Sequence, residues 1–318
     1  MFSKKSQVMQ NANFPTDADG RVYHLFIRPG EAANRVLTVG DVPRAVAIAK
    51  TPGFEVKFIR RAPRLFTTIT GLYKGVPVTI ITSLMGIPNA DFTFRELRHC
   101  IQGPFAIVRI GTCGTPLEDA KVGDIIVPDV YRTVLRNPDA FVPGKSFPIE
   151  QRYLVSGEMH PDHDLTSIVR KHVAALSYKM HAGSCLSCCS FYSSQGRQDQ
   201  NFQDQNVELV DHYIKTVPGF SMMEMESAHF CDLARCVNSK VCGAVHMSAA
   251  HIALAQRKSN DFLSNEKKHE IEMGLGKAIL DALVEFKIPG EVTTVANSVW
   301  THTGEPLGDW NEFKVEFK

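Results

Sequence analysis

A glycine and an arginine follow the first buried strand that the sequence predicts. The apolar run Arg35–Gly40 leads into Gly40-Asp41-Val42-Pro43-Arg44. Glycine lets the backbone approach a ligand closely, and an arginine four residues later can donate two parallel hydrogen bonds to a phosphate. Gly40 and Arg44 are therefore candidate ligands of an anion. The same five residues are also typical of an ordinary strand-to-helix turn with a surface arginine.

A second arginine lies inside an apolar strand. Arg109 lies near the end of the run Phe105–Gly111, and this run is followed by Thr112-Cys113-Gly114. A buried charge is costly without a partner, so Arg109 must face either an internal carboxylate, such as Glu96, or a bound anion. The turn after it offers backbone N–H groups and the Thr112 hydroxyl, which suit an oxyanion pocket at a sheet edge.

Two further segments carry polar groups that could bind an organic substrate. Glu224-Met225-Glu226 places two carboxylates at a predicted strand–helix junction, where they could bind sugar hydroxyls, a metal or a base, or simply favour the helix dipole. Phe191-Tyr192-Ser193-Ser194-Gln195-Gly196-Arg197 sets an aromatic pair beside an amide and a guanidinium. Gln195 both donates and accepts while Arg197 only donates, which matches the edge of a uracil ring, although a plain polar loop is the alternative.

The elements that must position these residues alternate between short β-branched runs and helical patterns. Strands are predicted at 35–40, 77–83, 105–111, 123–129 and 240–250, helices at 91–100, 165–180 and 267–286, and a strand running into a helix at 221–237. This order indicates an α/β protein with helices on both faces of a largely parallel sheet. The Pro- and Gly-rich residues 136–148 predict a long loop inserted into one domain.

Composition narrows the function further. The 318 residues include 35 basic and 34 acidic side chains, a balance that argues against a nucleic-acid partner. No apolar run approaches the ~20 residues that cross a bilayer, and the N-terminus lacks a hydrophobic signal segment, so we expect no membrane partner and a cytoplasmic location. Residues 1–20 are expected to be flexible, with 21–318 as a single catalytic domain.

Eight cysteines are present, and in such a protein they are expected to be buried thiols. The cluster Cys185-x-x-Cys188-Cys189 leaves a local disulfide or a zinc site as alternatives. A second ligand pair with the form of a zinc ribbon is missing, which disfavours zinc. We therefore predict no metal and no cofactor.

Taken together, the four motifs resemble the nucleoside phosphorylase-I family. The Gly-Asp-x-x-Arg turn, the Arg-x-Gly-Thr strand end and Glu-Met-Glu-Ser occur in that family's order, and Phe-Tyr-x-x-Gln-x-Arg looks like the base-reading insert of uridine phosphorylases. The resemblance runs from about Val22 to about Glu285. It implies a three-layer α/β/α fold with a central mixed, strongly twisted sheet.

The resemblance also implies a role for each candidate residue. Phosphate would be bound by Gly40, Arg44, Arg64, Arg109 and Thr112; ribose by His24, Met225 and Glu226; and the base by Phe191, Gln195, Arg197 and Glu224. Arg64 and His24 look like the residues that family members donate across a dimer interface. We therefore expect a homo-oligomer, favouring a dimer, with shared active sites.

Three departures from the family pattern stand out. Leu65 occupies a position where bacterial members often have a carboxylate that helps to bind a monovalent cation. Many uridine phosphorylases carry Asn-Arg after the strand assigned to 240–250, where this chain reads Ser248-Ala249-Ala250-His251, so His251 is a candidate for part of that role. The same segment lacks the Ser-Asp pair with which purine-cleaving relatives protonate the base.

The implied activity is the reversible phosphorolysis of uridine to uracil and ribose 1-phosphate in pyrimidine salvage, with inorganic phosphate as a co-substrate. The alternatives are another nucleoside phosphorylase or a nucleosidase of the same fold, or a non-catalytic nucleoside-binding relative.

Overall fold

The computed structural model describes residues 8–317. Of the N-terminal segment expected to be flexible, residues 1–7 lie outside this range, and Gln10, Thr16 and Val22 are joined by isolated β-bridges. None of the helices in the described range is both long and apolar enough to cross a membrane.

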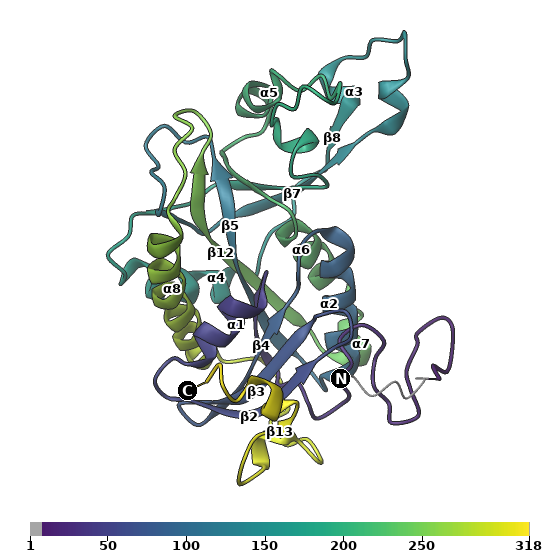
Figure 1. Ribbon diagram of the computed structural model, residues 1–318, viewed down its shortest axis with the longest axis vertical. Coiled ribbons are helices and arrows are strands. Elements are labelled where there is room, and N and C mark those ends of the chain that lie inside the picture. Colours follow the sequence, from purple (N-terminus) through teal and green to yellow (C-terminus); the bar gives the residue numbers. More distant parts are fainter. Residues whose placement is uncertain (1–7, 318) are drawn as a thin grey trace.

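A mixed sheet forms the centre of the molecule (Figure 1). Its strands are β1 (Arg35–Val39), β2 (Phe54–Arg61), β3 (Thr67–Tyr73), β4 (Val76–Thr82), β5 (Phe105–Thr115), β6 (Ile125–Ile126), β7 (Val130–Arg136), β8 (Tyr153–Val155), β9 (Met180–His181), β10 (Ser184–Cys188), β11 (Phe220–Glu224), β12 (Val245–Gln256) and β13 (Leu307–Gly308). The main path runs β13-β2-β3-β4-β1-β5-β11-β10-β7-β8, and β12 pairs with β5 and β6.

Helices cover both faces of this sheet. They are α1 (Val42–Ala49), α2 (Ile87–Cys100), α3 (Ile149–Arg152), α4 (His163–Ala174), α5 (Leu209–Thr216), α6 (Ser227–Cys236), α7 (Ser239–Cys242), α8 (Asn265–Glu285) and α9 (Trp310–Phe313). Figure 1 shows α1, α4 and α8 on one side and α2, α6 and α7 on the other. The expected three-layer α/β/α architecture with a central mixed sheet is confirmed.

The central parallel strands are buried on both faces, because helices cover each side of the sheet. Every residue of β1 is buried, and β1 pairs in parallel with β4 and β5. One apolar core lies under α1, α4 and α8 and another under α2 and α6. Gly276 lets α8 approach α1 closely, since a Cβ there would lie 2.6 Å from Ile48.

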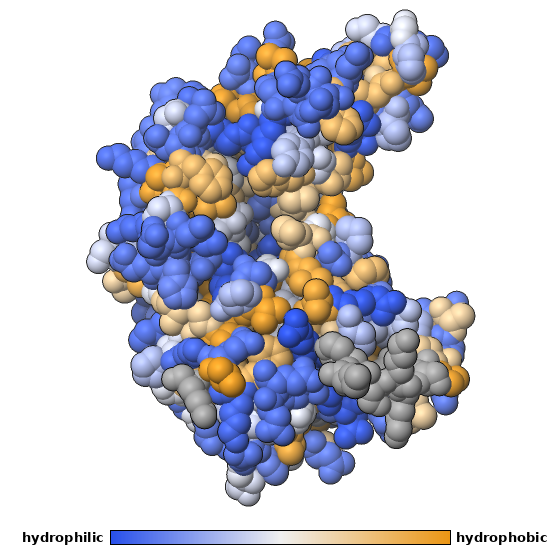
Figure 2. All heavy atoms as spheres, viewed as in Figure 1, coloured by the Kyte–Doolittle hydropathy of each residue, from blue (hydrophilic) through white to orange (hydrophobic). Residues whose placement is uncertain are grey.

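A smaller lobe projects from one end of the sheet (Figure 1). It contains α3, β8 and α5, and its own apolar cluster includes Tyr153, Leu209 and Tyr213. Figure 2 shows a concave flank between this lobe and the rest of the molecule. Residues 142–148 of the predicted loop have no regular structure, while Pro138–Phe141 form a short 3-10 helix.

Most predicted elements are confirmed, but the helix predicted at 165–180 ends at Ala174, with Met180 in β9, and two strand predictions need correction. The strand expected at 123–129 has only two residues in the ladder, β6. The strand expected at 240–250 begins later and ends later, as β12 (Val245–Gln256), because Ser239–Cys242 form α7 and Gly243 turns the chain with a φ of 85°. The end of β12 is consequently six residues further along than expected, which matters for the site below.

Asp281 of α8 connects this helix to the sheet. Its carboxylate accepts hydrogen bonds from Tyr73 Oη at 2.9 Å, Lys74 Nζ at 2.6 Å and Lys277 Nζ at 2.8 Å. Partial burial works to raise the pKa of Asp281, but the three donors lower it to about 2. A carboxylate with a depressed pKa stabilises the fold above its unfolded pKa and loses that contribution as the pH falls through the folded pKa.

Asp281→Asn is therefore expected to lower the free energy of unfolding by about 1 kcal/mol at neutral pH. The loss should shrink as the pH falls from about 4 towards 2, where the wild-type carboxylate is itself protonated. Urea unfolding at neutral and acidic pH measures this, with the exposed Asp211→Asn on α5 as the matched control. An equal loss at both pH values would contradict the assignment.

Candidate active site

A cavity of about 220 Å³ opens where β1 ends and where β5 passes β11 and β12. Ten of the twelve residues predicted to form the site line it: Gly40, Arg44, Arg109, Thr112, Phe191, Gln195, Arg197, Glu224, Met225 and Glu226. These residues are distributed between positions 40 and 226 of the sequence, and the fold brings them to one place. The other two, His24 and Arg64, do not line this cavity.

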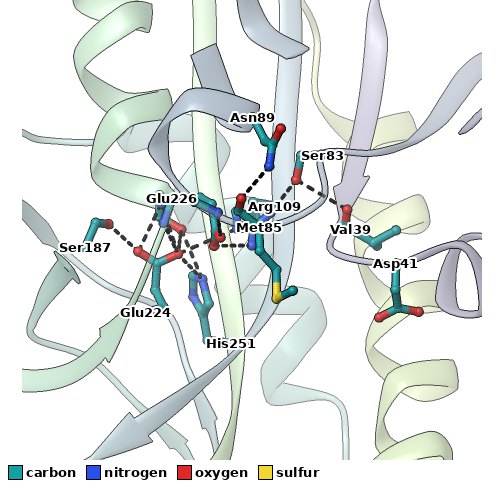
Figure 3. A network of polar contacts seen from close by, with 12 residues as sticks. Val39, Asp41, Ser83, Met85, Asn89, Arg109, Ser187, Glu224, Glu226 and His251 are labelled. Atoms are coloured by element: carbon teal, nitrogen blue, oxygen red, sulfur yellow. Dashed lines mark hydrogen bonds and ion pairs between the residues drawn. The ribbon is translucent and has the colours of Figure 1, made fainter. Parts of the chain in front are cut away.

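Arg109 lines the cavity and lies within the network of polar contacts shown in Figure 3. Its Nη2 is 2.5 Å from Glu226 Oε2, its Nη1 donates to Ser83 Oγ at 2.7 Å, and its Nε is 3.6 Å from Glu224 Oε2. The partner of this buried arginine is therefore a pair of internal carboxylates, and Glu96 is not one of them. Glu96 instead accepts hydrogen bonds from the backbone of His24 and Leu25.

Glu224 uses both carboxylate oxygens for hydrogen bonds within the protein. Its oxygens accept from Ser187 Oγ, from the Glu226 and Ser227 backbone N–H groups at 3.0 Å, and from Ser227 Oγ at 2.9 Å. The backbone donors are at the start of α6, so Glu224 caps this helix. Burial works to raise the pKa of Glu224, but His251, Arg109 and Ser187 hold it well below its usual range.

Glu226 has a different environment from Glu224, two residues before it. It accepts from the Gly86 backbone N–H at 2.5 Å and from Arg109, which binds the β4–α2 turn to the start of α6. Burial raises the pKa of Glu226; Arg109 opposes the shift, and the Glu224 charge adds to it. Both carboxylates line the cavity, but Glu224 accepts more hydrogen bonds from the protein, so Glu226 is the carboxylate more available to a ligand.

His251 lies beneath the cavity floor. Its ring is fully buried, its Nε2 is 3.0 Å from Ser227 Oγ, and its Nδ1 has no hydrogen-bond partner among residues 8–317. Ser227 Oγ donates to Glu224, so its lone pair accepts the His251 Nε2 proton. Burial lowers the pKa of His251. Gly111 is required here because a Cβ would lie 2.7 Å from the imidazole.

Arg44 is fixed by two carboxylates. Its Nε donates to Glu272 Oε1 of α8 at 2.7 Å, and its Nη2 is 3.1 Å from Asp41 Oδ2. Asp41 also caps α1 by accepting from the Arg44 backbone N–H. Arg44 and Glu272 are both buried, so this guanidinium is not a surface group. Its orientation leaves part of its planar fork directed at the cavity beside Gly40.

The predicted base-reading residues form one cluster at the cavity wall. Arg197 stacks on the Phe191 ring at 3.7 Å, and its Nη1 donates to Gln195 Oε1 at 2.6 Å and to the Phe191 carbonyl at 2.7 Å. Gln195 is buried. Burial, followed by repulsion from Arg257, lowers the pKa of Arg197 to about 10, so Arg197 remains charged at neutral pH.

Arg257 is the functional residue that the sequence reasoning missed. It directly follows β12 and donates from Nη1 to the Gln195 carbonyl at 2.8 Å and from Nη2 to the Gly196 carbonyl at 3.3 Å. Because β12 continues to Gln256, the pair at the strand end is Gln256-Arg257, so an arginine follows this strand although the Asn-Arg pair expected from the resemblance is not found there. The alternating apolar pattern up to Ala255 was the available signal.

Two exposed apolar side chains at the cavity, Met85 and Phe262, carried no signal in the sequence. They belong to the β4–α2 turn and to the loop before α8. Either would be an ordinary surface residue if the cavity were not beside it.

His24 and Arg64 lie together, away from the cavity. His24 Nδ1 is 2.6 Å from Glu96 Oε1, and its ring stacks on Phe92 at 3.7 Å. Arg64 is exposed and donates from Nη2 to Tyr23 Oη at 2.6 Å, with its guanidinium 4.2 Å from the Tyr23 ring centroid. Within a single chain, neither residue can reach a ligand in the cavity.

All eight cysteines, which lie in the described part of the chain, are free thiols. Cys185 and Cys188 are buried on β10, and Cys185 Sγ lies 3.6 Å from Glu224 Oε1. The local disulfide considered for this cluster is absent. Among residues 8–317, no group of three or more His, Cys, Asp or Glu side chains is placed to hold a metal ion.

Arg109→Ala would leave Glu224 and Glu226 buried without their cation. Removing one partner of a buried ion pair typically costs about 3–5 kcal/mol of unfolding free energy, and a loss of that size is expected here. The double variant Arg109→Ala/Glu226→Gln should recover part of it, because one of the two unpaired charges is gone. Urea unfolding of both variants provides the test, and a wild-type stability for Arg109→Ala would contradict the central role of this ion pair.

Comparison with known proteins shows which family this chain resembles. The sequence profile of the phosphorylase superfamily matches residues 34–285. The uridine phosphorylase of Thermococcus kodakarensis is 29% identical over 229 residues, covering 70% of this chain and 76% of that protein. A purine nucleoside phosphorylase of the DeoD type from Streptococcus suis is 28% identical over 205 residues, covering 64% of this chain and 76% of its own.

Solved structures agree with the sequence comparison. A structure from a study of two uridine phosphorylases of the oomycete Phytophthora capsici has a TM-score of 0.80 at 35% identity, covering 88% of this chain and 100% of the other. A nucleoside phosphorylase from Trypanosoma brucei, at 20% identity, shares the fold with a TM-score of 0.69, covering 86% of this chain and 100% of its own. The chain therefore belongs to the phosphorylase superfamily, as a member of its nucleoside phosphorylase-I family.

Proposed function

We propose that the protein is a uridine phosphorylase, which cleaves uridine with inorganic phosphate to uracil and ribose 1-phosphate in pyrimidine salvage. The observation that carries this proposal is the wall formed by Gln195 and Arg197, which faces the same cavity as Arg44, Arg109 and Glu226. An anion site, a carboxylate suited to ribose hydroxyls and a pyrimidine-edge reader thus share one space of about 220 Å³.

The base-reading wall suits uracil because of the hydrogen bonds still available. Arg197 Nη1 and Gln195 Oε1 bind each other, and within residues 8–317 the Gln195 Nε2 and Arg197 Nη2 groups make no hydrogen bond. Both can donate to carbonyl oxygens, which uracil presents on either side of its ring N–H. Phe191 supplies an apolar face for the ring. Cytosine has an amino group in place of one carbonyl, so it would leave a buried donor unpaired.

The arrangement would accelerate the reaction by stabilising charge at both ends of the breaking bond. Positive charge develops at the anomeric carbon, and negative charge develops on the departing base. Phosphate held by Arg44, Arg109 and Thr112 would lie near the sugar as the nucleophile, while Glu226 holds the ribose hydroxyls. Arg197, which stays protonated, would stabilise the negative charge of the uracil anion by donating a hydrogen bond to it, so a general acid is not required.

Cleavage of purine nucleosides is the second candidate, because one of the relatives is a purine nucleoside phosphorylase. Two observations favour the pyrimidine. The only histidine near the cavity floor in residues 8–317, His251, is buried and does not line the cavity. The carboxylate nearest to His251 is Glu224, whose oxygens are already engaged and whose pKa is depressed. Neither group is placed to protonate a purine.

The charges in the cavity support a composite site. Arg109 is paired with Glu226 and Arg44 with Glu272, so the two phosphate arginines of one chain are largely neutralised. A phosphate dianion would therefore bind better with an additional cation. Arg64 is exposed and has no carboxylate partner among residues 8–317, which fits a residue that serves the cavity of a neighbouring copy.

The purified protein is expected to release uracil from uridine only when phosphate is present, and to form ribose 1-phosphate in equal amount. Cytidine should not be cleaved, and inosine should have a kcat/KM at least about tenfold lower than uridine. Arg197→Ala should lower kcat/KM for uridine by about 10²–10³. The exposed Arg235→Ala is the matched control. Uracil release without phosphate, or a preference for inosine, would reject the proposal.

A mixture of two inactive variants tests the shared site. Arg64→Ala and Arg197→Ala should each be inactive alone, because one lacks the donated arginine and the other lacks the base reader. In a two-fold dimer formed by refolding the two together, about a quarter of the sites contain both arginines. Activity should therefore return to about that fraction of wild type. Wild-type activity of Arg64→Ala alone would place Arg64 outside the site, and activity of the mixture that stays at the level of the separate variants would contradict its donation to a neighbouring copy.

A further inference from the structure

The loop that carries Gln195 and Arg197 has an uncommon pattern of hydrogen bonds, in which the carbonyls of five consecutive residues accept from side chains. The donors are Asn206 to Ser193 O at 2.8 Å, Tyr213 to Ser194 O at 3.1 Å, Arg257 to Gln195 O and Gly196 O, and Asn206 again to Arg197 O at 3.0 Å. Side chains from three separate segments therefore determine the path of this loop.

Asn206 connects the two ends of the loop. Its single amide nitrogen donates to the carbonyls of Ser193 and Arg197, which lie four residues apart, and its Oδ1 accepts from Gln198 Nε2 at 3.2 Å. The side chain is buried, with 3% of its surface exposed. Between the bonded ends, Gly196 turns the chain in the left-handed region with a φ of 65°. Both amide hydrogens are thus committed to closing the turn.

The base readers depend on this backbone for their position. The Gln195 side chain has one hydrogen bond within residues 8–317, from Arg197 Nη1, so the two side chains hold each other and are located by the loop. Hydrogen-bond recognition of a base requires placement to within about 0.5 Å. Asn206 also precedes α5 in the projecting lobe, which is packed by its own apolar cluster (Figure 1).

We propose that Asn206 is a positioning residue for base selection, which closes the turn 193–197 and so holds Gln195 and Arg197 in the geometry that reads uracil. This proposal rests on the proposed function for the identity of the base. It makes no use of the anion-binding residues, because neither Arg44 nor Arg109 contacts this loop in the structure's hydrogen bonds. Loss of the turn should therefore raise KM for the nucleoside and leave KM for phosphate unchanged.

Asn206→Asp keeps the shape of the side chain, removes both donors and places a carboxylate against two carbonyls. The expected result is an increase of about tenfold or more in KM for uridine, with KM for phosphate unchanged within about twofold. The ratio of kcat/KM for uridine to that for inosine should fall. Hydrogen exchange of the amides of residues 193–197 should become faster in the ligand-free protein.

Asn201→Asp is the matched control, because it is the same chemical change on the same segment, at an exposed residue that bonds only to Asp199. It should leave both KM values unchanged. Tyr213→Phe removes one donor, to Ser194 O, and should shift KM for uridine in the same direction by a smaller factor. This variant also keeps the proposal testable if Asn206→Asp does not fold.

The outcomes separate this proposal from the proposed function. A wild-type protein that does not cleave uridine rejects the proposed function, and the same variants are then assayed with the nucleoside that it does cleave. A wild-type protein that cleaves uridine, with variants whose uridine KM and uridine-to-inosine ratio are unchanged, rejects the role of Asn206. So do variants in which the KM values for uridine and phosphate rise together, because that pattern indicates a general structural defect.

Discussion

The buried charge of Arg109 is the constraint around which the cavity is organised. An arginine in the middle of an apolar sheet needs anionic partners, and β11 supplies Glu224 while the start of α6 supplies Glu226. Glu226 in turn binds the Gly86 N–H, and Glu224 binds the first N–H groups of α6. One guanidinium thus fixes the relative positions of β5, β11, α6 and the β4–α2 turn.

The two adjacent carboxylates have different tasks because their surroundings differ. Glu224 receives enough hydrogen bonds to keep its charge in a buried place, and its oxygens are occupied. Glu226 has fewer donors and reaches the cavity, so it is the group that can exchange a protein contact for a ligand contact. The first carboxylate holds the helix start in place, and the second, although buried, lines the cavity at that same helix start.

The proposed anion site and the proposed base-reading loop are supported by separate parts of the molecule. The anion-facing arginines are fixed by carboxylates of the main body, with Glu272 of α8 holding Arg44. The base-reading loop is fixed by the projecting lobe and by Arg257 at the end of β12. Since few groups are common to both supports, one part of the cavity can change its ligand without disturbing the other. The two relatives described above, one named a uridine phosphorylase and the other a purine nucleoside phosphorylase, are consistent with this division.

The α/β class, the principal central strands, four of the helices and ten residues of the cavity could be predicted from the sequence alone, because these follow from local periodicity and from short motifs. The sequence did not indicate which charged side chains form ion pairs with one another. The carboxylate partner of Arg109 is Glu226 instead of Glu96, and that of Arg44 is Glu272, 228 positions away. The predicted end of β12 was also wrong, and Arg257 was therefore missed. Pairing between distant segments depends on sheet register and helix packing, which a local pattern does not encode. Only the tertiary structure decides these contacts, because a buried charge or a strand end is satisfied by whatever the fold brings next to it.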